Sequence, residues 1–296
     1  MFLQAMRIIA INIIYLLAFL GLSAQVNTPF VVDFENHQIG PYTMAMAKQD
    51  FPPDLSGYDY WYYGMDQGRA EIVEDNGNKA LRVKYPANCV GPHDTPQGCG
   101  IQIRWKLPET ADTMWLSYRI KFEQDFEFVQ GGKLPGLCGG KCYTGGMVPP
   151  QGDGWSARIM WRADGAIVQY MYFTEQSGIY GDDMKWDLDG TQRKFMPGIW
   201  HTVTTQIILN TIPGNSIKGK KNGIVRSWLD QQLVLEVDTL RLTDFKNQPI
   251  DVFYFSTFHG GNDSSWAPGI DCYIRYDDFL ISKNAPNPLK FREYEN

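Results

Sequence analysis

The sequence predicts an all-β protein with a single domain, a β-jelly roll in which two antiparallel sheets form a sandwich with a cleft. Short runs of alternating apolar and polar residues recur along the chain, and Gly, Pro, Asn and Asp separate them. No long helical periodicity follows the N-terminal segment. Many short strands with turn residues between them are typical of sandwiches and jelly rolls. The runs expected to be strands are Ala80–Tyr85, Gly100–Leu107, Met114–Phe122, Ser156–Trp161, Ile167–Phe173, His201–Leu209, Val225–Val237, Val252–Phe258 and Cys272–Ser282.

Residues 1–24 are expected to be a secretory signal peptide. Arg7 precedes an apolar run, Ile8–Leu22, and small residues follow it. A basic start, a short apolar stretch and a small-residue exit are the features of such a peptide, and the run of about 15 residues is shorter than the roughly 20 that span a bilayer. We therefore expect a secreted or periplasmic protein with no membrane attachment after cleavage. Residues 25–286 are expected to form the domain, and residues 287–296 a frayed tail.

The charge balance argues against general binding of nucleic acid. The chain has 27 Lys and Arg against 33 Asp and Glu, a net charge of −6. Removal of Arg7 with the signal peptide leaves 26 basic residues against the same 33 acidic ones. An acidic protein attracts polyanions poorly, so a polyanionic substrate requires cations concentrated in one cleft. A monomer is the default expectation.

Five cysteines fit an exported protein. Cys89 and Cys99 bracket a loop of Gly, Pro and His, and Cys138 and Cys142 bracket Gly139-Gly140-Lys141. Both spacings could close small disulfide loops, which export permits. Cys272 is then left as a buried free thiol. The pattern lacks the regular Cys and His spacing of a zinc site, so no metal is expected.

Two strand-forming runs flank Asp164-Gly165 and indicate a hairpin. A three-residue loop that begins at Ala163 would place Arg158 opposite Tyr170 and Ser156 opposite Tyr172, on one face. That loop requires left-handed backbone only at its glycine. A two-residue loop also requires it at the aspartate and moves Arg158 and Tyr170 to opposite faces. The sequence favours the first register, although an exposed face without chemistry would show the same spacing.

The segment Gly131–Gly154 is rich in Gly and Pro and is expected to be a long loop of functional importance. It contains GGKLPG, residues 131–136, and so brings in Lys133. Together with Ser156-x-Arg158 and Tyr170-x-Tyr172, this motif resembles polysaccharide lyase family 14. Weaker matches cover much of the rest of the mature chain, at Gly198–His201, Phe258–Gly261 and Tyr276–Phe279.

The resemblance implies a β-jelly roll that cleaves alginate or a related glucuronan. It implies a functional set of Lys133, Ser156, Arg158, Tyr170 and Tyr172. Mannuronate-rich alginate is the expected substrate, and glucuronan is the alternative. The insertion between Cys138 and Cys142 departs from the family pattern, which puts substrate preference in doubt more than chemistry.

These residue types suit β-elimination from a uronate. The reaction removes the C5 proton and expels the oxygen on C4, so positive charge must stabilise the carboxylate as an enolate-like intermediate. Lys133 and Arg158 can supply that charge, and Arg can bind a carboxylate through two hydrogen bonds. Nearby cations should lower the pKa of a tyrosine, so Tyr170 and Tyr172 are candidates for base and acid. Ser156 would orient the substrate or a phenol, and no cofactor is required.

Further residues are expected to contact the substrate. Gln102 and Arg104 alternate on one predicted strand, His93 lies in the Cys89–Cys99 loop, and His259 lies in a Gly-rich turn. The aromatic run Trp61-Tyr62-Tyr63 could stack on sugar rings, with core packing the expected role of at least one of the three.

Two other functions compete with a lyase. The run Glu123–Glu127 carries three acids at alternating positions and resembles the acidic strand of laminarinase-type glycoside hydrolases, which need two carboxylates. A solvated strand face is the better explanation of these acids, because Phe122, Phe126 and Phe128 alternate with them. A carbohydrate-binding module without catalysis also uses jelly rolls. Binding alone does not require paired phenols beside two cations, so the lyase is favoured.

Overall fold

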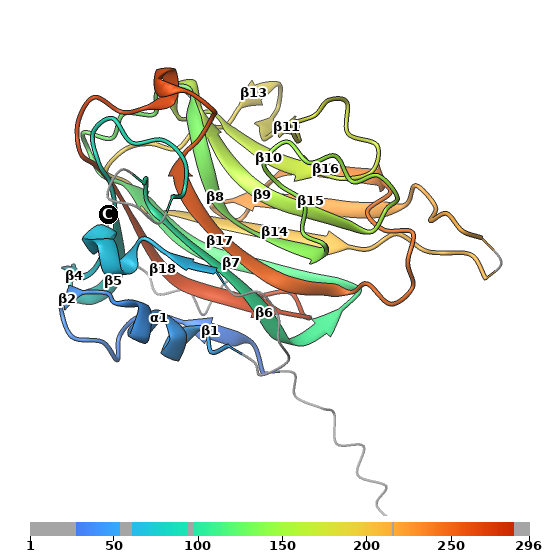
Figure 1. Cartoon of the computed structure of the whole chain (residues 1–296), viewed down its shortest axis with the longest axis horizontal. Coiled ribbons are helices and arrows are strands. Elements are labelled where there is room, and N and C mark those ends of the chain that lie inside the picture. The colour runs from blue at the N-terminus through green and yellow to red at the C-terminus, as the bar shows by residue number, and fades with distance from the viewer. Residues whose placement is uncertain (1–27, 54–60, 94–97, 215, 287–296) are drawn as a thin grey trace, which may run out of the picture.

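The computed structural model describes residues 28–53, 61–93, 98–214 and 216–286. The expected signal peptide and tail lie outside these ranges. Nearly all of the regular structure in the described chain consists of strands in two antiparallel sheets, which confirms the predicted all-β jelly roll (Figure 1). One helix, α1 (Met44–Asp50), and short helical turns at Met65–Arg69, Ala163–Gly165 and Ser264–Trp266 complete it.

Sheet A has nine strands. Its order is β16 (Gln232–Leu240), β15 (Gly223–Leu229), β14 (His201–Ile208), β7 (Thr113–Phe122), β18 (Cys272–Ser282), β5 (Asn78–Tyr85), β4 (Ala70–Asp75) and β2 (Gly40–Pro41), and β1 (Phe30–Val32) also pairs with β18.

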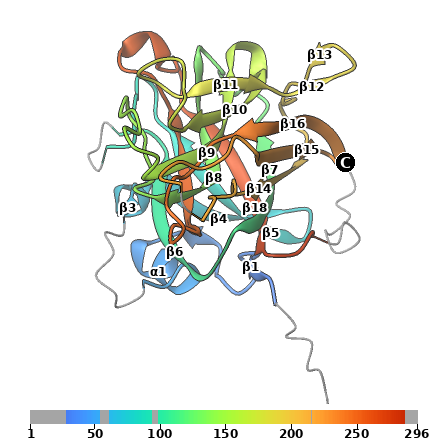
Figure 2. The same cartoon turned by 90° about the vertical axis from the view of Figure 1, so that its right-hand side faces the viewer.

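Sheet B has seven strands. Its order is β11 (Asp182–Lys185), β10 (Ile167–Tyr172), β9 (Gly154–Arg162), β8 (Gly131–Gly140), β17 (Ile250–His259), β6 (Ile101–Ala111) and β3 (Trp61–Tyr63). In Figure 2 the labels of β11, β10, β9 and β8 follow one another in this order. A separate hairpin joins β12 (Asp187–Leu188) to β13 (Thr191–Gln192).

The main core lies between the sheets and is rich in aromatic rings. The ring centroid of Phe255 in β17 lies 5.0 Å from that of Phe279 and 5.1 Å from that of Tyr276, both in β18. All three side chains are fully buried. Burial of each such side chain contributes about 1.5–3 kcal/mol to the stability of the fold. Strand residues alternate between faces, so the neighbours Tyr254 and Ser256 point to the outer face of sheet B. That face carries the predicted site.

Two predicted elements differ from the structure. Val225–Val237, expected as one strand, is β15 and β16 joined by a tight turn at Asp230 and Gln231, whose φ angles are 49° and 69°. The expected loop Gly131–Gly154 begins with a ten-residue strand, β8, in the middle of sheet B. Glycine has poor intrinsic strand preference, and here close packing against neighbouring strands overrides that preference.

Both expected disulfides form, Cys89–Cys99 and Cys138–Cys142, and Cys272 is a buried free thiol. Among the described residues, no helix is both long enough and apolar enough to cross a bilayer.

Candidate active site

Lys133 projects from the middle of β8, between β9 and β17. Its backbone pairs with Met160 on one side and Phe258 on the other. Glycine allows this close approach, because a Cβ added at Gly132 would lie 2.1 Å from the ring of Trp161. Lys133 therefore lies on a rigid element, and the expectation that it enters from a loop is wrong.

The β9–β10 hairpin has the register favoured by the sequence. Arg158 pairs with Tyr170, and Ser156 pairs with Tyr172. The turn differs from the expectation in one respect, because Asp164 has a positive φ of 56° in addition to Gly165 at 75°. Aspartate tolerates this conformation better than most residues, so the three-residue loop accommodates two left-handed positions.

The two tyrosines form a compact pair. Their hydroxyl oxygens are 3.3 Å apart and their rings meet edge to face, with centroids 5.5 Å apart. The backbone N–H of Gly146 donates to the Tyr172 hydroxyl at 3.0 Å, and that of Gly181 donates to the Tyr170 hydroxyl at 3.2 Å. Two loops thus fix the phenols, and neither donor was identified from the sequence.

Three cations surround the tyrosine pair. The Lys133 amine lies 4.4 Å from the centroid of the Tyr170 ring, and the guanidinium carbons of Arg158 and Arg162 lie 5.8 and 5.6 Å from it. Arg162 forms an ion pair with Asp183 at 2.6 Å. In the described part of the chain, neither Lys133 nor Arg158 forms an ion pair with a carboxylate.

Arg158 is buried, and its hydrogen bonds go to neutral hydroxyls. It donates to Ser256 Oγ at 3.1 Å and to Thr144 Oγ1 at 2.6 Å, while its Nε has no partner among the described residues. A buried cation without a counter-charge is unfavourable unless an anion approaches. The arrangement is therefore suited to an anionic ligand. Thr144 and Ser256 were not predicted, although Ser256 lies on a predicted strand in alternation with Tyr254.

The pKa shifts in the site differ from the sequence-based expectation. Burial, reinforced by the hydrogen bond with Tyr172, raises the pKa of Tyr170 despite the charge of Arg158. The prediction that cations lower it is therefore wrong for Tyr170, because loss of hydration outweighs the attraction. Burial, with repulsion from Arg158 and Arg162, lowers the pKa of Lys133 well below its ordinary value. Tyr170 thus tends to hold its proton and Lys133 to lose one.

Ser156 occupies the predicted face but is fully buried. Its hydroxyl donates to the carbonyl oxygen of Tyr143 at 2.6 Å. Tyr143 begins the segment that carries Thr144 and Gly146, so this bond positions two groups that contact Arg158 and Tyr172. The geometry indicates a positioning role for Ser156.

Gln102 and Arg104 project from β6 on the same outer face. Gln102 pairs with Ser256 and donates a hydrogen bond to the Tyr254 hydroxyl. The guanidinium of Arg104 lies 5.0 Å from the Trp61 ring. Tyr254 in turn lies 5.0 Å from the Arg158 guanidinium, so a continuous set of side chains joins β6 to the tyrosine pair.

The two histidines are placed differently. The His259 ring faces the core, where it stacks on Phe126 at 5.3 Å and meets Trp161 at 5.2 Å. The His259 side chain is fully buried, which argues against the expected contact with substrate. His93 is exposed, and its carbonyl accepts a hydrogen bond from Arg69 at 2.8 Å. Its contact with substrate stays a prediction.

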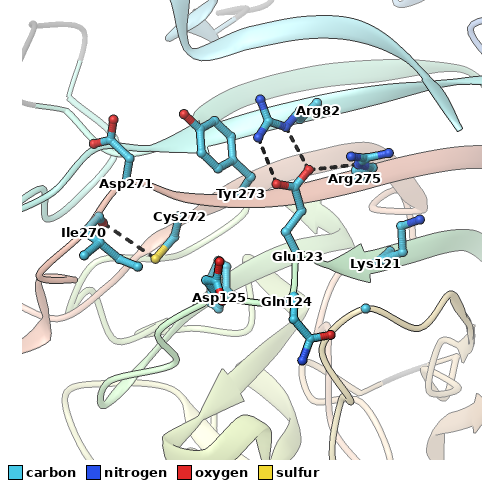
Figure 3. A pocket seen from close by; sticks show the side chains of 12 residues that line it. Arg82, Lys121, Glu123, Gln124, Asp125, Ile270, Asp271, Cys272, Tyr273 and Arg275 are labelled. Atoms are coloured by element: carbon cyan, nitrogen blue, oxygen red, sulfur yellow. Dashed lines mark hydrogen bonds and ion pairs between the residues drawn. The ribbon is translucent and has the colours of Figure 1, made fainter.

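The acids of the hydrolase alternative lie elsewhere. β7 ends at Phe122, so Glu123–Glu127 is not the alternating strand that was expected. Figure 3 shows Glu123 held by Arg82 at 2.8 Å and Arg275 at 2.9 Å. Burial opposes ionisation of Glu123, but these hydrogen bonds outweigh it and lower its pKa. Such a carboxylate is a poor general acid. Glu123 lines a pocket with Arg82 and Arg275, and none of the five predicted catalytic residues lines it.

Residues 73–279 match the profile of the family Polysaccharide lyase 14. This chain belongs to polysaccharide lyase family 14. The fold of the alginate lyase Aly36B is similar, with a TM-score of 0.71 at 23% identity over 86% of this chain and 97% of that one. The family 14 alginate lyase from Aplysia kurodai has a TM-score of 0.68 at 25% identity over 86% of this chain and 98% of that one. The alginate lyase vAL-1 from Chlorella virus has a TM-score of 0.63 at 17% identity, over 76% and 93% of the two chains. No curated relative matches.

Membership of the family makes this protein a polysaccharide lyase. The GGKLPG segment and both paired strands fall within the matched range. Lys133, Arg158, Tyr170 and Tyr172 are brought together on the outer face of sheet B. No cluster of three or more His, Cys, Asp or Glu able to hold a metal occurs among the residues described.

Proposed function

We propose that this lyase cleaves alginate, with mannuronate-rich chains preferred, by β-elimination at the site around Lys133, Arg158 and the tyrosine pair. The observation that carries the proposal is the buried Arg158 guanidinium, which has no carboxylate partner in the described chain and lies beside the Lys133 amine and two phenols. A uronate supplies the missing negative charge. Aly36B double mutants bind an alginate trisaccharide and tetrasaccharide, which supports the same substrate class here.

Arg158 is the group that receives the substrate carboxylate. Its guanidinium is fixed by Thr144 and Ser256 before substrate arrives, so little reorganisation accompanies binding. Negative charge grows on the carboxylate as the C5 proton leaves, and a preorganised buried cation stabilises that charge more than water does. Arg158 thus lowers the barrier to proton removal.

The directions of the pKa shifts support one assignment of the proton transfers. The Lys133 amine, whose neutral form is favoured by burial and repulsion, accepts the C5 proton. The electrons of the C5–H bond form the C4–C5 double bond, and the C4–O bond breaks. Tyr170, whose raised pKa keeps it protonated, donates its proton to the departing oxygen. Tyr172 forms a hydrogen bond with the Tyr170 hydroxyl and so positions it. This assignment replaces the expectation that a tyrosine is the base.

Export is part of the proposal. The expected signal peptide precedes the domain, and two disulfides within the domain fit an oxidising environment. The test is to locate the protein and determine its N-terminus. We expect it in the medium or periplasm, with the chain cleaved near residue 24. Retention of the full-length chain inside the cell would contradict it.

The substrate test offers polymannuronate, polyguluronate and glucuronan separately to the mature protein. β-Elimination creates a conjugated double bond, so ultraviolet absorbance rises as the polymer is cut. We expect the fastest rise with polymannuronate, and a rise slower by about 10²–10³ with Arg158→Met. A faster rise with glucuronan would make glucuronan, and not alginate, the preferred substrate. The expected preference for mannuronate rests on the family resemblance alone. No rise with any polymer would overturn the proposal.

A further inference from the structure

A second aromatic and cationic group lies on the outer face of sheet B, at the edge opposite the tyrosine pair. Trp61 and Tyr63 project from β3 with their rings stacked, 6.2 Å apart and 13° from parallel. Tyr62 between them faces inward and donates to the carbonyl oxygen of Phe51. Trp61 and Tyr63 are only partly buried. Flat aromatic faces of this kind are suited to the apolar faces of sugar rings.

Positive charge lies beside this aromatic pair. Arg104 of β6 pairs with Trp61 in register and places its guanidinium 5.0 Å from the Trp61 ring. The Arg104 guanidinium also donates to the carbonyl oxygen of Lys141 at 3.1 Å. Lys141 lies between the disulfide-bonded Cys138 and Cys142, so this small loop fixes the guanidinium.

Arg104 lies among charged neighbours. Arg104 and Lys106 both attract the Asp251 carboxylate. Lys141 carries its own counter-charge, Asp153, at 2.7 Å. A guanidinium beside an aromatic platform matches the chemistry of a uronate, which has a carboxylate and an apolar ring face.

The aromatic pair is joined to the catalytic groups without a break. Tyr254 meets Trp61 edge to face at 6.3 Å and lies 5.0 Å from the Arg158 guanidinium. Arg104 on β6 and Arg158 on β9 are three strand spacings apart in sheet B, which is roughly 14 Å at the usual strand separation. One sugar ring cannot reach both guanidinium groups, whereas a chain of several uronate residues laid across the strands can.

We propose that Trp61, Tyr63 and Arg104 form a remote subsite that binds a uronate several residues away from the bond that is cut. This inference rests on the proposed function, because it assumes that the same polymer lies along the face. The subsite binds long chains more tightly and leaves the chemical step unchanged, so its contribution depends on substrate length.

The test compares polymannuronate with the shortest oligomer that the wild type cuts, using Trp61→Ala and Arg104→Gln. We expect KM for the polymer to rise about tenfold in Trp61→Ala, equivalent to the loss of one stacking contact of ~1.4 kcal/mol. KM for the shortest oligomer and kcat for both should stay close to wild type. Trp228→Ala is the matched control, because Trp228 stacks on Trp115 in sheet A, away from this face.

Equal KM values for polymer in wild type, Trp61→Ala and Arg104→Gln would overturn the inference while leaving the lyase proposal intact. A parallel loss of kcat on all substrates would also overturn it, since that result indicates a structural role. If wild type cuts no uronate polymer, the proposed function fails separately. Calorimetric titration with polymannuronate then tests whether the subsite binds the polymer. Equal affinity of wild type and Trp61→Ala would refute the subsite. Tyr63→Ala replaces Trp61→Ala if the latter does not fold.

Discussion

Acid should destabilise the fold through His259. The ring is fully buried against Phe126, Trp161 and Tyr85, and neither ring nitrogen has a partner in the described chain. Burial lowers the pKa of His259 to about 3 from 6.5. The unfolded chain therefore binds the proton first as pH falls below 6.5, and the stability that neutral His259 allows is lost progressively down to about pH 3.

The pKa shift of His259 determines how much folding stability is lost in acid. At about 1.36 kcal/mol for each pH step below the unfolded pKa, acidification from pH 7 to pH 4.5 should cost about 3 kcal/mol through this residue. His259→Leu has a similar volume and cannot take up a proton. Its free energy of unfolding should therefore fall by about 3 kcal/mol less than that of wild type between these two pH values.

Urea unfolding of wild type, His259→Leu and the control His93→Leu at both pH values measures this difference. Carboxyl groups contribute to acid sensitivity in all three proteins and cancel in the comparison. His93 is exposed, so His93→Leu should follow wild type. An identical loss of stability in wild type and His259→Leu would refute the assignment of a buried neutral histidine.

Four further outcomes are expected from the site. Lys133→Ala and Tyr170→Phe should each lower kcat by about 10²–10⁴, the usual range for a general base or acid, measured by absorbance at saturating polymer. Arg158→Met should cost about 10²–10³ in kcat/KM, since it removes the main stabilising charge. Wild-type kcat should rise with pH as Lys133 deprotonates below its ordinary pKa and fall only in strong alkali as Tyr170 ionises. The alkaline fall should disappear from the residual activity of Tyr170→Phe; its persistence would assign the acid elsewhere. Gly132→Ala should destabilise the fold by about 1–3 kcal/mol, seen as a lower urea midpoint, because the added Cβ meets Trp161.

The strand pattern predicted the fold class and the hairpin because both depend on local periodicity. Alternation placed Arg158 with Tyr170 and Ser156 with Tyr172, and the structure has that register. Alternation counted from Phe253 and Phe255, which face the core, also places His259 on the inner face, where its ring lies. A single residue of uncertainty in strand register reverses the face of every side chain, so isolated positions at strand ends were the least predictable.

Tertiary packing determined what the sequence could not show. β8 is a strand because Gly132 and Gly136 let the neighbouring strands approach; a Cβ at Gly136 would lie 2.1 Å from the carbonyl oxygen of Ala157. The raised pKa of Tyr170 follows from burial, which charge spacing along the sequence does not report. Thr144, Gly146 and Gly181 reach the site from loops, and their alignment with Arg158 and the tyrosines depends on the folded chain.

The central claim is that the groups around Lys133, Arg158 and Tyr170 cut a uronate chain by elimination. The most direct test counts double bonds and new reducing ends together while the mature protein digests polymannuronate. Elimination predicts one double bond for every new reducing end at all stages of the digestion, and both products at a rate lower by about 10²–10⁴ with Lys133→Ala. Reducing ends that appear without double bonds would mean hydrolysis and would contradict the account.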